Sequence, residues 1–400
     1  MLLNTGNTRS VLYVATIAKI SYTLWSIPPT GEIDHIIQNH MSKRVIIAAG
    51  GTGGHLFPAM ALASHIHGQM PHTQVTFMAH GLAHNPRFTK SFPFVDIASA
   101  PSFLSGCVHL CRGVCQSLYH LRKMRPDLVV GFGSFHTAPV LLAAKMLSIP
   151  FVLHEANAIP GKVNRWLSGW ARWTGVFFPA AQSYLRGTTK QVNIPLRKEF
   201  LPENQPDKAH SLAYFGFADH KKTILVFGGS QGAQGINDRV VEACEFLQHP
   251  KSLRIIHYTG DVNKRDSAAE QYARYGIEAV VKEFEPCMHH AWSLASCFIG
   301  RAGAGAIAEQ LAFKVPGILI PYPHAADNHQ EKNAEYVERV IGGGRCYNEK
   351  SLTPQDVMSI VSECFDDISI LNMIENINSY VKSSHQEDFC QAIQKELEKY

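Results

Sequence analysis

The sequence carries little charge and contains no long apolar run. Charged residues make up 18% of its 400 residues, while apolar residues make up 46% and aromatic residues 10%. This composition excludes an intrinsically disordered chain, a collagen-like fibre and a polytopic membrane protein. The length exceeds what one ordinary hydrophobic core organises, so we expect two domains of roughly 150–200 residues each.

Paired cysteines are also missing, because none of the nine cysteines forms a Cys-x-x-Cys motif. Cys107, Cys111 and Cys115 recur every four residues, which places them along one face of a helix. This spacing does not suit a zinc site, so we interpret the three as small buried apolar side chains. Free thiols in this number indicate a reducing cytosol.

Three nucleotide-binding signatures are absent. The first glycine-rich loop does not fit Gly-x-Gly-x-x-Gly, and the next strand ends at Met78–Gly81 without a carboxylate, which argues against NAD. The loop Gly228–Ala233 lacks the lysine of a Walker A motif, and the chain contains no Asp-x-Asp pair. We therefore expect no metal and no cofactor, and a nucleotide diphosphate would be held by helix N-termini and arginine.

Residues 1–40 differ from the rest of the chain. Val11–Ile27 is the only candidate membrane segment, but 12 of its 17 residues are apolar and Lys19 interrupts it. A spanning helix needs about 20 mostly apolar residues. Met41–Arg44 leads directly into a strand pattern, so we expect residues 1–40 to be an extension outside the fold, with a weak surface anchor as the alternative.

From Arg44 onward, short apolar runs alternate with longer amphipathic ones, which predicts an α/β fold with parallel sheets. The polar segment Gly187–Asp219, with three prolines, is typical of a connection between domains. We expect an N-terminal domain over 41–197, a C-terminal domain over 198–379, and a final helix over 380–400 that is able to pack back on the first domain. The expected strands are Val45–Ala48, Val75–Ala79, Leu128–Val130, Phe151–Leu153, Ile224–Phe227, Leu253–Tyr258, Ala279–Val281, Cys297–Ile299 and Gly317–Ile320.

Three glycine-rich loops each follow an expected strand and precede a helix. They are Gly50–His55, with a helix expected from Pro58, then Gly228–Ala233 and Gly300–Ala306. Such loops let the backbone approach a ligand closely and present helix N–H groups to an anion. Each loop alone is a weak signal, but together they predict phosphate recognition between two doubly wound sheets.

His55 is the candidate general base. The chain has 21 histidines, and only the position of His55 at the mouth of a glycine-rich loop distinguishes it from the others. Polar groups also follow two other strands, at His154–Asn157 and Asp327–Gln330. They suit hydrogen bonds to sugar hydroxyls, although such residues often only cap turns.

Several segments, in order, resemble the MurG family of bacterial transferases, which add N-acetylglucosamine to lipid I during peptidoglycan synthesis. The resemblance runs from about Met41 to the C-terminus. It implies two Rossmann-like doubly wound domains facing across a cleft, the GT-B type, with UDP-N-acetylglucosamine bound in the cleft. The matching segments are residues 48–63 (AAGGTGGHLFPAMALA), 131–167, 194–197 (IPLR), 227–238 (FGGSQGAQGIND), 283–288 (EFEPCM) and 301–334.

The resemblance also implies roles for individual residues, with His55 as the base and the others as contacts of UDP-N-acetylglucosamine. Two departures are visible: the family's Asn-Pro-Val-Arg is Ile194–Arg197 here, and the loop Gly303–Ala306 lacks the family's serine or threonine. The implied contacts are Thr52, Gly53 and Gly54 at the sugar and diphosphate, Asn157, Arg197, Ser230 at phosphate, Phe284 beside uracil, the Glu285 backbone at its edge, Ala304, Gly305, Ala306, Ile307 and Ala308 over the diphosphate, Glu309 at the ribose, and Gln330 with His329 at the glucosamine ring.

The activity implied is inverting transfer of N-acetylglucosamine to the 4-hydroxyl of lipid I, giving lipid II. Two alternatives stay open: a UDP-N-acetylglucosamine epimerase on the same architecture, and a non-catalytic nucleotide-sugar-binding scaffold. The expected partners are UDP-N-acetylglucosamine, lipid I, an anionic membrane surface and other cell-wall synthesis proteins, and no nucleic acid. The expected location is peripheral, at the cytoplasmic face of the bacterial inner membrane.

The net charge of +4 conceals an asymmetry. Residues 41–197 contain 15 Lys and Arg against three acidic residues, whereas residues 198–400 contain 20 basic and 28 acidic residues. Apolar and basic side chains are interleaved in two stretches of the first half, which suits anionic lipid headgroups, although a buried helix face with solvated charges is equally consistent. The stretches contain Phe103, Leu104, Leu110, Leu118 and Tyr119 with Arg112, Arg122, Lys123 and Arg125, and Trp166, Trp170 and Trp173 with Arg165 and Arg172.

Overall fold

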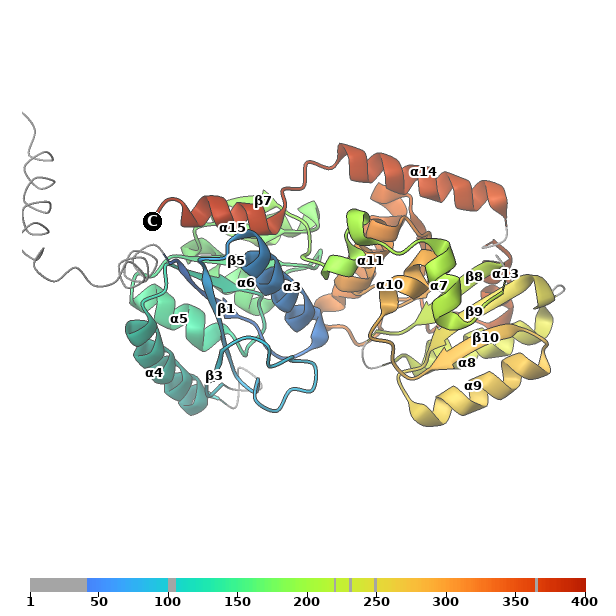
Figure 1. The fold of residues 1–400 in the computed structure, drawn as a ribbon, viewed down its shortest axis with the longest axis horizontal. Coiled ribbons are helices and arrows are strands. Elements are labelled where there is room, and N and C mark those ends of the chain that lie inside the picture. Colours follow the sequence, from blue (N-terminus) through green and yellow to red (C-terminus); the bar gives the residue numbers. More distant parts are fainter. Residues whose placement is uncertain (1–41, 100–105, 219–220, 230–231, 248–249, 364–365) are drawn as a thin grey trace, which may run out of the picture.

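The structure is a computed structural model that describes residues 42–99, 106–218, 221–229, 232–247, 250–363 and 366–400. The predictions for residues 1–40, Phe103, Leu104 and Ser230 lie outside these ranges. Two α/β domains lie side by side, the first in blue to green and the second in yellow to red (Figure 1).

The N-terminal domain is built on a seven-stranded parallel sheet in the order β3-β2-β1-β4-β5-β6-β7. Its central strands are apolar and buried because helices cover both faces. The strands are β1 (Arg44–Ala48), β2 (Gln74–Ala79), β3 (Phe94–Asp96), β4 (Leu128–Gly131), β5 (Phe151–Glu155), β6 (Thr174–Val176) and β7 (Thr189–Gln191).

The C-terminal domain contains a six-stranded parallel sheet in the order β10-β9-β8-β11-β12-β13. In both sheets the chain order reverses beside the first strand, at β1/β4 and at β8/β11, which is where doubly wound folds bind ligands. The strands are β8 (Lys222–Phe227), β9 (Leu253–Tyr258), β10 (Glu278–Lys282), β11 (Ala295–Gly300), β12 (Gly317–Leu319) and β13 (Gly344–Cys346).

Helices of the first domain form two layers. One face of its sheet packs on α3 (Gly53–Gln69) and α15 (Phe389–Leu397), the other on α4 (Cys107–Met124), α5 (Ala138–Met146) and α6 (Lys162–Leu167). The last helix of the chain therefore lies on the first domain, as the red ribbon over the blue one shows (Figure 1). Two backbone bonds continue this return, from Glu387 N to the Gln191 carbonyl at 3.0 Å and from Asn193 N to the Glu387 carbonyl at 3.1 Å.

The second domain has the same two-layer arrangement. Residues of α10, α11, α12 and α14 join one apolar cluster with the side chain of Leu212 from α7, and α8, α9 and α13 join the other. The helices are α7 (Lys208–Phe215), α8 (Gln234–Ala243), α9 (Val262–Arg274), α10 (Met288–Leu294), α11 (Ala304–Phe313), α12 (His329–Tyr336), α13 (Pro354–Glu363) and α14 (Asp367–Ser383). Short turns complete the chain: η1 (Ser168–Trp170), η2 (Pro179–Tyr184), η3 (Lys198–Phe200), η4 (Pro202–Asn204), η5 (Cys244–Phe246), η6 (Pro250–Ser252), η7 (Ala326–Asn328) and the π-helical η8 (Val337–Ile341).

The predicted fold class and all nine expected strands are confirmed, but three local predictions are wrong. The segment Gly187–Asp219 is not only a connection, because it begins with the edge strand β7 and contains α7. The first helix begins at Gly53, not at Pro58. Proline is accommodated there because it removes only one hydrogen bond, to the Gly54 carbonyl in the first turn.

The prediction that the cysteine stripe of α4 is buried is also wrong, since Cys111 and Cys115 are exposed. A second stripe with the same four-residue spacing, Gly113, Ser117 and Leu121, faces the interior instead. Gly113 decides which face packs, because a Cβ atom there would collide with the Ala98 carbonyl.

Candidate functional site

The first glycine-rich loop joins β1 to the N-terminus of α3. Gly50 lies so close to its neighbours that an added Cβ would be 3.1 Å from the Cβ atoms of Ala79 and His136, and Gly51 adopts a φ of +86°. Thr52 is the N-cap of α3, but its side chain makes no capping bond, and the first turn contains no acidic residue. The start of α3 is therefore an uncapped positive helix end, which suits an anion or an electron-rich sugar oxygen.

His55 lies in this first turn and is half-buried. Burial lowers the pKa of its imidazole, and His329 lowers it further, whereas Glu155 and a hydrogen bond with the Phe132 carbonyl oppose the shift. The imidazole is therefore neutral near pH 7 and able to accept a proton. Because His55 belongs to the first domain and His329 to the second, the effect of His329 on the pKa of His55 indicates that the two domains meet at this point.

The loop after β5 holds Asn157 at the junction of the domains. The buried Glu155 carboxylate shapes this loop by accepting hydrogen bonds from Asn157 N, Gly161 N and Asn164 Nδ2, each at 2.9 Å. Asn333 of α12 donates from Nδ2 to Asn157 Oδ1 at 3.1 Å and accepts at Oδ1 from Ala158 N at 2.8 Å. Glu155 is thus a structural anchor, and Asn157 is fixed by the opposite domain.

The second glycine-rich loop follows β8. Gly229 and Gly232 have φ values of +88° and +72°, and a Cβ on Gly232 would collide with the Thr259 carbonyl. No side chain caps α8 at Ala233. Gly229 and Gly232 thus allow a tight turn in which the backbone is able to come close to a ligand.

The third loop leads into α11, whose N-cap Gly303 makes no side-chain bond. Open space surrounds the Cα atoms of Gly303 and Gly305, since an added Cβ would meet nothing within 4 Å. Beneath the loop, Arg301 forms two bonds to the Glu349 carboxylate, at 2.9 and 3.0 Å. The N-terminus of α11 is therefore accessible, and the Arg301–Glu349 ion pair holds the loop before it in place. The hydrogen-bond donors it offers are the backbone N–H groups of Ala304, Gly305, Ala306, Ile307 and Ala308.

Glu309 lies on the second turn of α11 and is half-buried. Its Oε2 accepts a hydrogen bond from Trp292 Nε1 at 2.8 Å. Burial raises the pKa of this carboxyl to about 7, although the indole bond and the positive charge of Arg197 act in the opposite direction. Near pH 7 the carboxyl is therefore partly ionised, and its protonation responds to small changes around it.

Phe284 and Glu285 follow β10 and differ in exposure. The Phe284 ring is 59% exposed, so a flat base is able to pack against it. The Glu285 side chain is buried and accepts from Lys282 Nζ at 2.7 Å, Tyr214 Oη at 2.8 Å and Cys287 N at 2.9 Å. Only the backbone of Glu285 remains for a ligand, which agrees with the role that the resemblance implies.

Arg197 connects the end of the first domain to the same loop of the second. Its guanidinium donates to the Pro286 carbonyl at 2.7 Å and lies 4.7 Å from the centre of the Phe200 ring. Its positive charge lowers the pKa of Glu309, which indicates that Arg197 lies near the first two turns of α11.

His329 and Gln330 begin α12, directly after Asp327 and Asn328, which have φ values of +52° and +53°. The His329 ring contacts the Ala326 carbonyl through Nδ1 at 2.8 Å, and Gln330 Oε1 accepts from Tyr322 N at 2.9 Å. Gln330 is thus oriented by its oxygen, with Nε2 left to donate. An ion pair between Arg165 and Asp327 joins this turn to the first domain.

The structure thus brings most of the sequence-predicted residues to one junction between the domains. Sequence reasoning missed two residues: Asn333, which bonds to Asn157 and Ala158 across the junction, and Trp292, which bonds to Glu309 within the second domain. Asn333 stands inside a segment that matches the family, whereas no local signal distinguishes Trp292 from an ordinary core tryptophan. Among the described residues no group of three or more histidine, cysteine or acidic side chains is arranged to bind a metal. In the same part of the chain, no helix has the length and apolar character needed to cross a bilayer.

Two parallel α/β domains with glycine-rich loops at their junction define a glycosyltransferase of the GT-B type. Residues 45–176 match the glycosyltransferase family 28 N-terminal domain, and residues 223–389 match the C-terminal domain of that family. The chain belongs to glycosyltransferase family 28 and, within it, to the MurG enzymes.

Curated relatives carry the name UDP-N-acetylglucosamine–N-acetylmuramyl-(pentapeptide) pyrophosphoryl-undecaprenol N-acetylglucosamine transferase. The protein of this name from Protochlamydia amoebophila is 44% identical, over 88% of this chain and 96% of that protein. The one from Chlamydia trachomatis serovar L2 is 34% identical, over 81% and 90% respectively. The crystal structure of MurG from Acinetobacter baumannii has the same fold, with a TM-score of 0.71 and 24% identity over 90% of this chain and 100% of that one.

Proposed function

We propose that this protein transfers N-acetylglucosamine from UDP-N-acetylglucosamine to the 4-hydroxyl of the N-acetylmuramyl sugar of lipid I, giving lipid II. The observation that carries the proposal is the relative 44% identical over 88% of the chain, whose name states this transfer. The structure agrees with the proposal, because the neutral His55 and the uncapped N-terminus of α11 both lie at the junction between the domains.

His55 is the general base of the proposed reaction. Its neutral imidazole takes the proton of the acceptor hydroxyl while the oxygen attacks the anomeric carbon and UDP departs, with inversion at that carbon. The charge that develops on the diphosphate is stabilised by the N-termini of α8 and α11, together with Ser230. Thr52, Gly53 and Gly54 face the sugar and diphosphate from the other side.

The remaining donor contacts come mostly from the second domain. Phe284 and the Glu285 backbone hold the uracil, Glu309 holds the ribose, and Gln330 with His329 holds the glucosamine ring. From the first domain, Asn157 and Arg197 complete the site. Donor binding thus requires both domains, because Asn157 is fixed by Asn333 and Arg197 by the Pro286 carbonyl.

We propose further that the face formed by α4, α5 and α6 docks on an anionic bilayer, where the lipid-linked acceptor resides. Exposed apolar side chains on this face include Val108, 79% exposed, and Tyr119, Met146, Trp166 and Trp170. Trp173, by contrast, is 2% exposed and contributes nothing to this surface.

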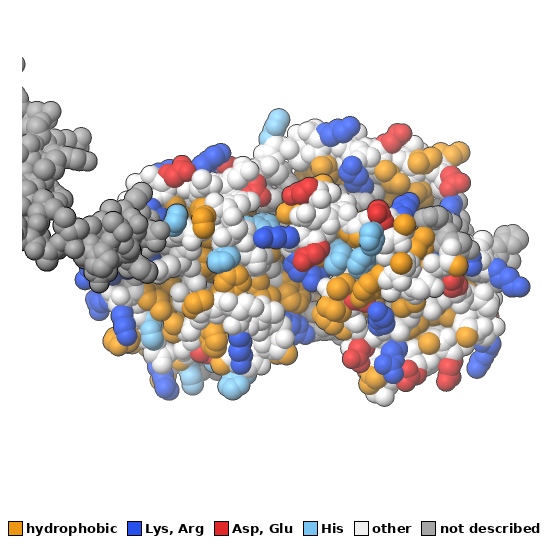
Figure 2. Space-filling model, in the orientation of Figure 1, with side chains coloured by type: hydrophobic (Ala, Val, Ile, Leu, Met, Phe, Trp, Pro, Cys, Tyr) orange, Lys and Arg blue, Asp and Glu red, His pale blue; other side chains and the backbone are white. Residues whose placement is uncertain are grey.

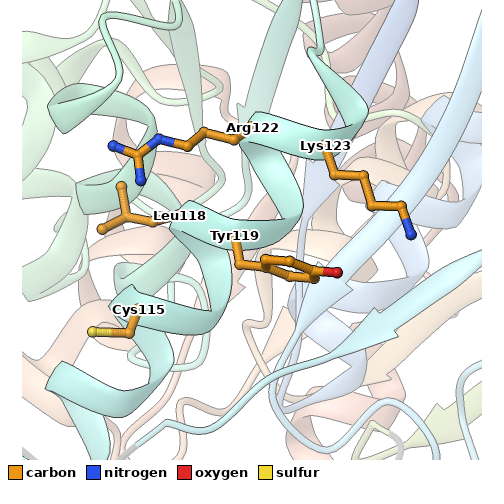
Figure 3. Close-up of a pocket in the computed structure, with 5 residues that line it drawn as sticks. All are labelled: Cys115, Leu118, Tyr119, Arg122 and Lys123. Atoms are coloured by element: carbon orange, nitrogen blue, oxygen red, sulfur yellow. The ribbon is translucent and has the colours of Figure 1, made fainter.

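A shallow hollow on α4 contains both kinds of side chain (Figure 3). Cys115, Leu118 and Arg122 point to one side of the helix, and Tyr119 and Lys123 to the other. Apolar side chains flanked by cations suit the interface of an anionic membrane. The protein would then be peripheral at the cytoplasmic face of the inner membrane, within reach of other cell-wall synthesis proteins.

The test is to incubate the purified protein with UDP-N-acetylglucosamine labelled in the sugar, with and without lipid I, and to follow the label. Transfer into the lipid phase only when lipid I is present is the expected result. Release of a modified free sugar without lipid I would instead identify an epimerase, and UDP binding without any turnover would identify a scaffold.

A further inference from the structure

Glu309 and Trp292 form a pair that links two neighbouring helices of the C-terminal domain. Glu309 lies on the second turn of α11, and Trp292 lies on α10, 17 residues earlier. The bond between them is 2.8 Å long, within the usual range for a strong N–H to carboxylate bond.

The indole is held rigidly by the core. Trp292 is 1% exposed, and its ring contacts those of Phe227, Phe298 and Phe313 at centroid distances of 5.7, 5.0 and 6.4 Å. An indole carries a single N–H donor and no acceptor, so its direction is fixed once the ring is packed. The Glu309 oxygen that accepts this bond, Oε2, is therefore fixed as well.

We propose that Trp292 is a positioning residue for the sugar-nucleotide donor, because its indole N–H holds the Glu309 carboxylate in the orientation that receives the ribose hydroxyls of the uridine nucleotide. This inference rests on the proposed function, and specifically on the role of Glu309 as the ribose contact. It adds a residue that does not touch the donor but determines how tightly the donor binds.

The charge of the carboxylate supports the same role. An ionised carboxylate accepts hydrogen bonds at both oxygens, whereas a protonated one has lost part of that capacity. Burial raises the pKa of Glu309, and two groups oppose the rise: the Trp292 N–H from α10 and the guanidinium of Arg197, directly before η3. The indole bond thus favours the form that binds two hydroxyls.

A similar pair in the first domain provides a matched control. Trp173 donates from Nε1 to Glu396 Oε2 at 3.0 Å, and Trp173 is also almost fully buried. The Glu396 carboxylate, however, accepts hydrogen bonds from Lys399, Arg172 and Tyr400. None of these three residues belongs to the proposed site for the sugar nucleotide. Replacing either tryptophan by phenylalanine removes one indole–carboxylate bond, but only one of the two bonds belongs to the donor site.

The experiment measures UDP affinity by calorimetry between pH 6 and 8.5 for the wild type and for Trp292→Phe, Trp173→Phe and Glu309→Gln. Trp292→Phe should weaken UDP binding roughly tenfold at pH 6.5. The loss should shrink toward pH 8.5, where the carboxylate is ionised with or without the indole. The KM for UDP-N-acetylglucosamine should rise in parallel, with kcat close to that of the wild type.

Trp173→Phe should lower the melting temperature and leave UDP affinity unchanged at every pH. Glu309→Gln leaves the aromatic core intact, should abolish the pH dependence, and should make the additional change Trp292→Phe almost without effect on UDP affinity. Trp292→Phe that melts earlier but binds UDP with the affinity and pH profile of the wild type would show a purely structural role and overturn the inference.

The outcomes also separate this inference from the proposed function. A wild-type protein that does not bind UDP contradicts both. Normal UDP affinity in Glu309→Gln contradicts the inference alone. The proposed transfer to lipid I is tested separately, by the label assay on the wild type.

Discussion

Both domains surround a parallel sheet with helices, yet their surfaces carry opposite charge. The first half of the folded chain has 15 basic and three acidic residues, and the second has 20 basic and 28 acidic residues. Figure 2 shows acidic side chains gathered over the C-terminal domain, on the right, with few over the region of α4 and α5. The interior of such a fold requires only apolar strands and helix faces, so the outer surface is free to differ with what each domain contacts.

The glycine-rich loops differ in a related way. The loop of the first domain carries a reactive side chain, His55, whereas the loop before α11 offers backbone groups at an open helix end. We propose that the first domain supplies proton transfer and the membrane surface, while the second supplies most contacts of the sugar nucleotide. The first three of the following experiments each test one domain, and the last tests the contact between the two.

The largest effect is expected from Phe389→Ala on α15. Phe389 is buried in the first domain against the rings of Phe132, His154 and Trp173. Removing it leaves a cavity, and we expect the free energy of unfolding to fall by about 3–5 kcal/mol. Scanning calorimetry should show the transition of the first domain moving to lower temperature.

The matched control for Phe389→Ala is Ile377→Ala on α14, a fully buried residue of the second domain only 12 positions earlier in sequence. It should lower the transition of the second domain instead. An unchanged first transition in Phe389→Ala would contradict the assignment of α15 to the first domain's core.

The second prediction concerns His55→Ala, which should reduce turnover of lipid I by roughly 10²-fold or more if His55 is the base. UDP affinity should change little, because the uridine contacts lie in the other domain. Since the pKa of His55 is lowered by burial, the active neutral form persists below pH 6.5 in the wild type. Activity should fall only at still lower pH, and turnover near the wild-type rate in His55→Ala would rule out this role.

The third prediction tests the charge difference directly. Arg112, Arg122 and Lys123 of α4 have no acidic partner among the described residues. Removing two cations near an anionic bilayer should cost about 2 kcal/mol, so Arg122→Gln with Lys123→Gln should reduce co-sedimentation with anionic liposomes roughly thirtyfold.

The control for the α4 pair is Lys264→Gln with Arg265→Gln on α9, an adjacent basic pair on the second domain. Both of these residues pair with acidic side chains, Lys264 with Asp238 and Arg265 with Asp266. Liposome binding should be unaffected by this change, and neutral liposomes should bind all variants weakly. Equal losses from the two pairs would contradict docking through the first domain.

The smallest effect is expected at the point where the domains join. Asn333→Ala leaves the Ala158 N–H without its partner and frees Asn157, at a cost of about 1–2 kcal/mol. We expect a modestly lower melting temperature and a KM for the donor several times higher, measured by steady-state kinetics. Asn333→Asp retains the acceptor for Ala158 but places a buried carboxylate oxygen against Asn157 Oδ1 and the Ala302 carbonyl, so it should be no more stable than Asn333→Ala.

Much of the fold was predictable because parallel strands are buried on both faces and appear as continuous apolar runs. The four strands missed are three residues long, and β7 is the polar triplet Thr189–Gln191 at a sheet edge. Periodicity likewise identified the helix of α4, but not which of its two stripes faces the sheet. That choice depends on contact between Gly113 and a neighbouring strand end, which is not encoded locally.

Site residues were predictable from the sequence only where a local motif marks them. His55 follows a strand and a glycine-rich loop, so its location is local. The two residues that the sequence did not reveal act at a distance: Trp292 bonds to Glu309 across 17 positions within the second domain, and Asn333 bonds to Asn157 across 176 positions. Only the packed structure brings such partners together, and ordinary core residues have the same sequence signature.

The return of α15 to the first domain has a consequence for protein synthesis. The apolar cluster beneath α3 includes Phe389, Ala392, Ile393 and Leu397, which are synthesised after every strand of the second domain. The first domain is therefore synthesised first but cannot complete its core until Leu397 has been added, whereas the second domain already has its full set of strands by Cys346. The order of synthesis and the order of folding are thus reversed for the domain that carries His55, so this histidine reaches its final surroundings only after the second domain has been synthesised.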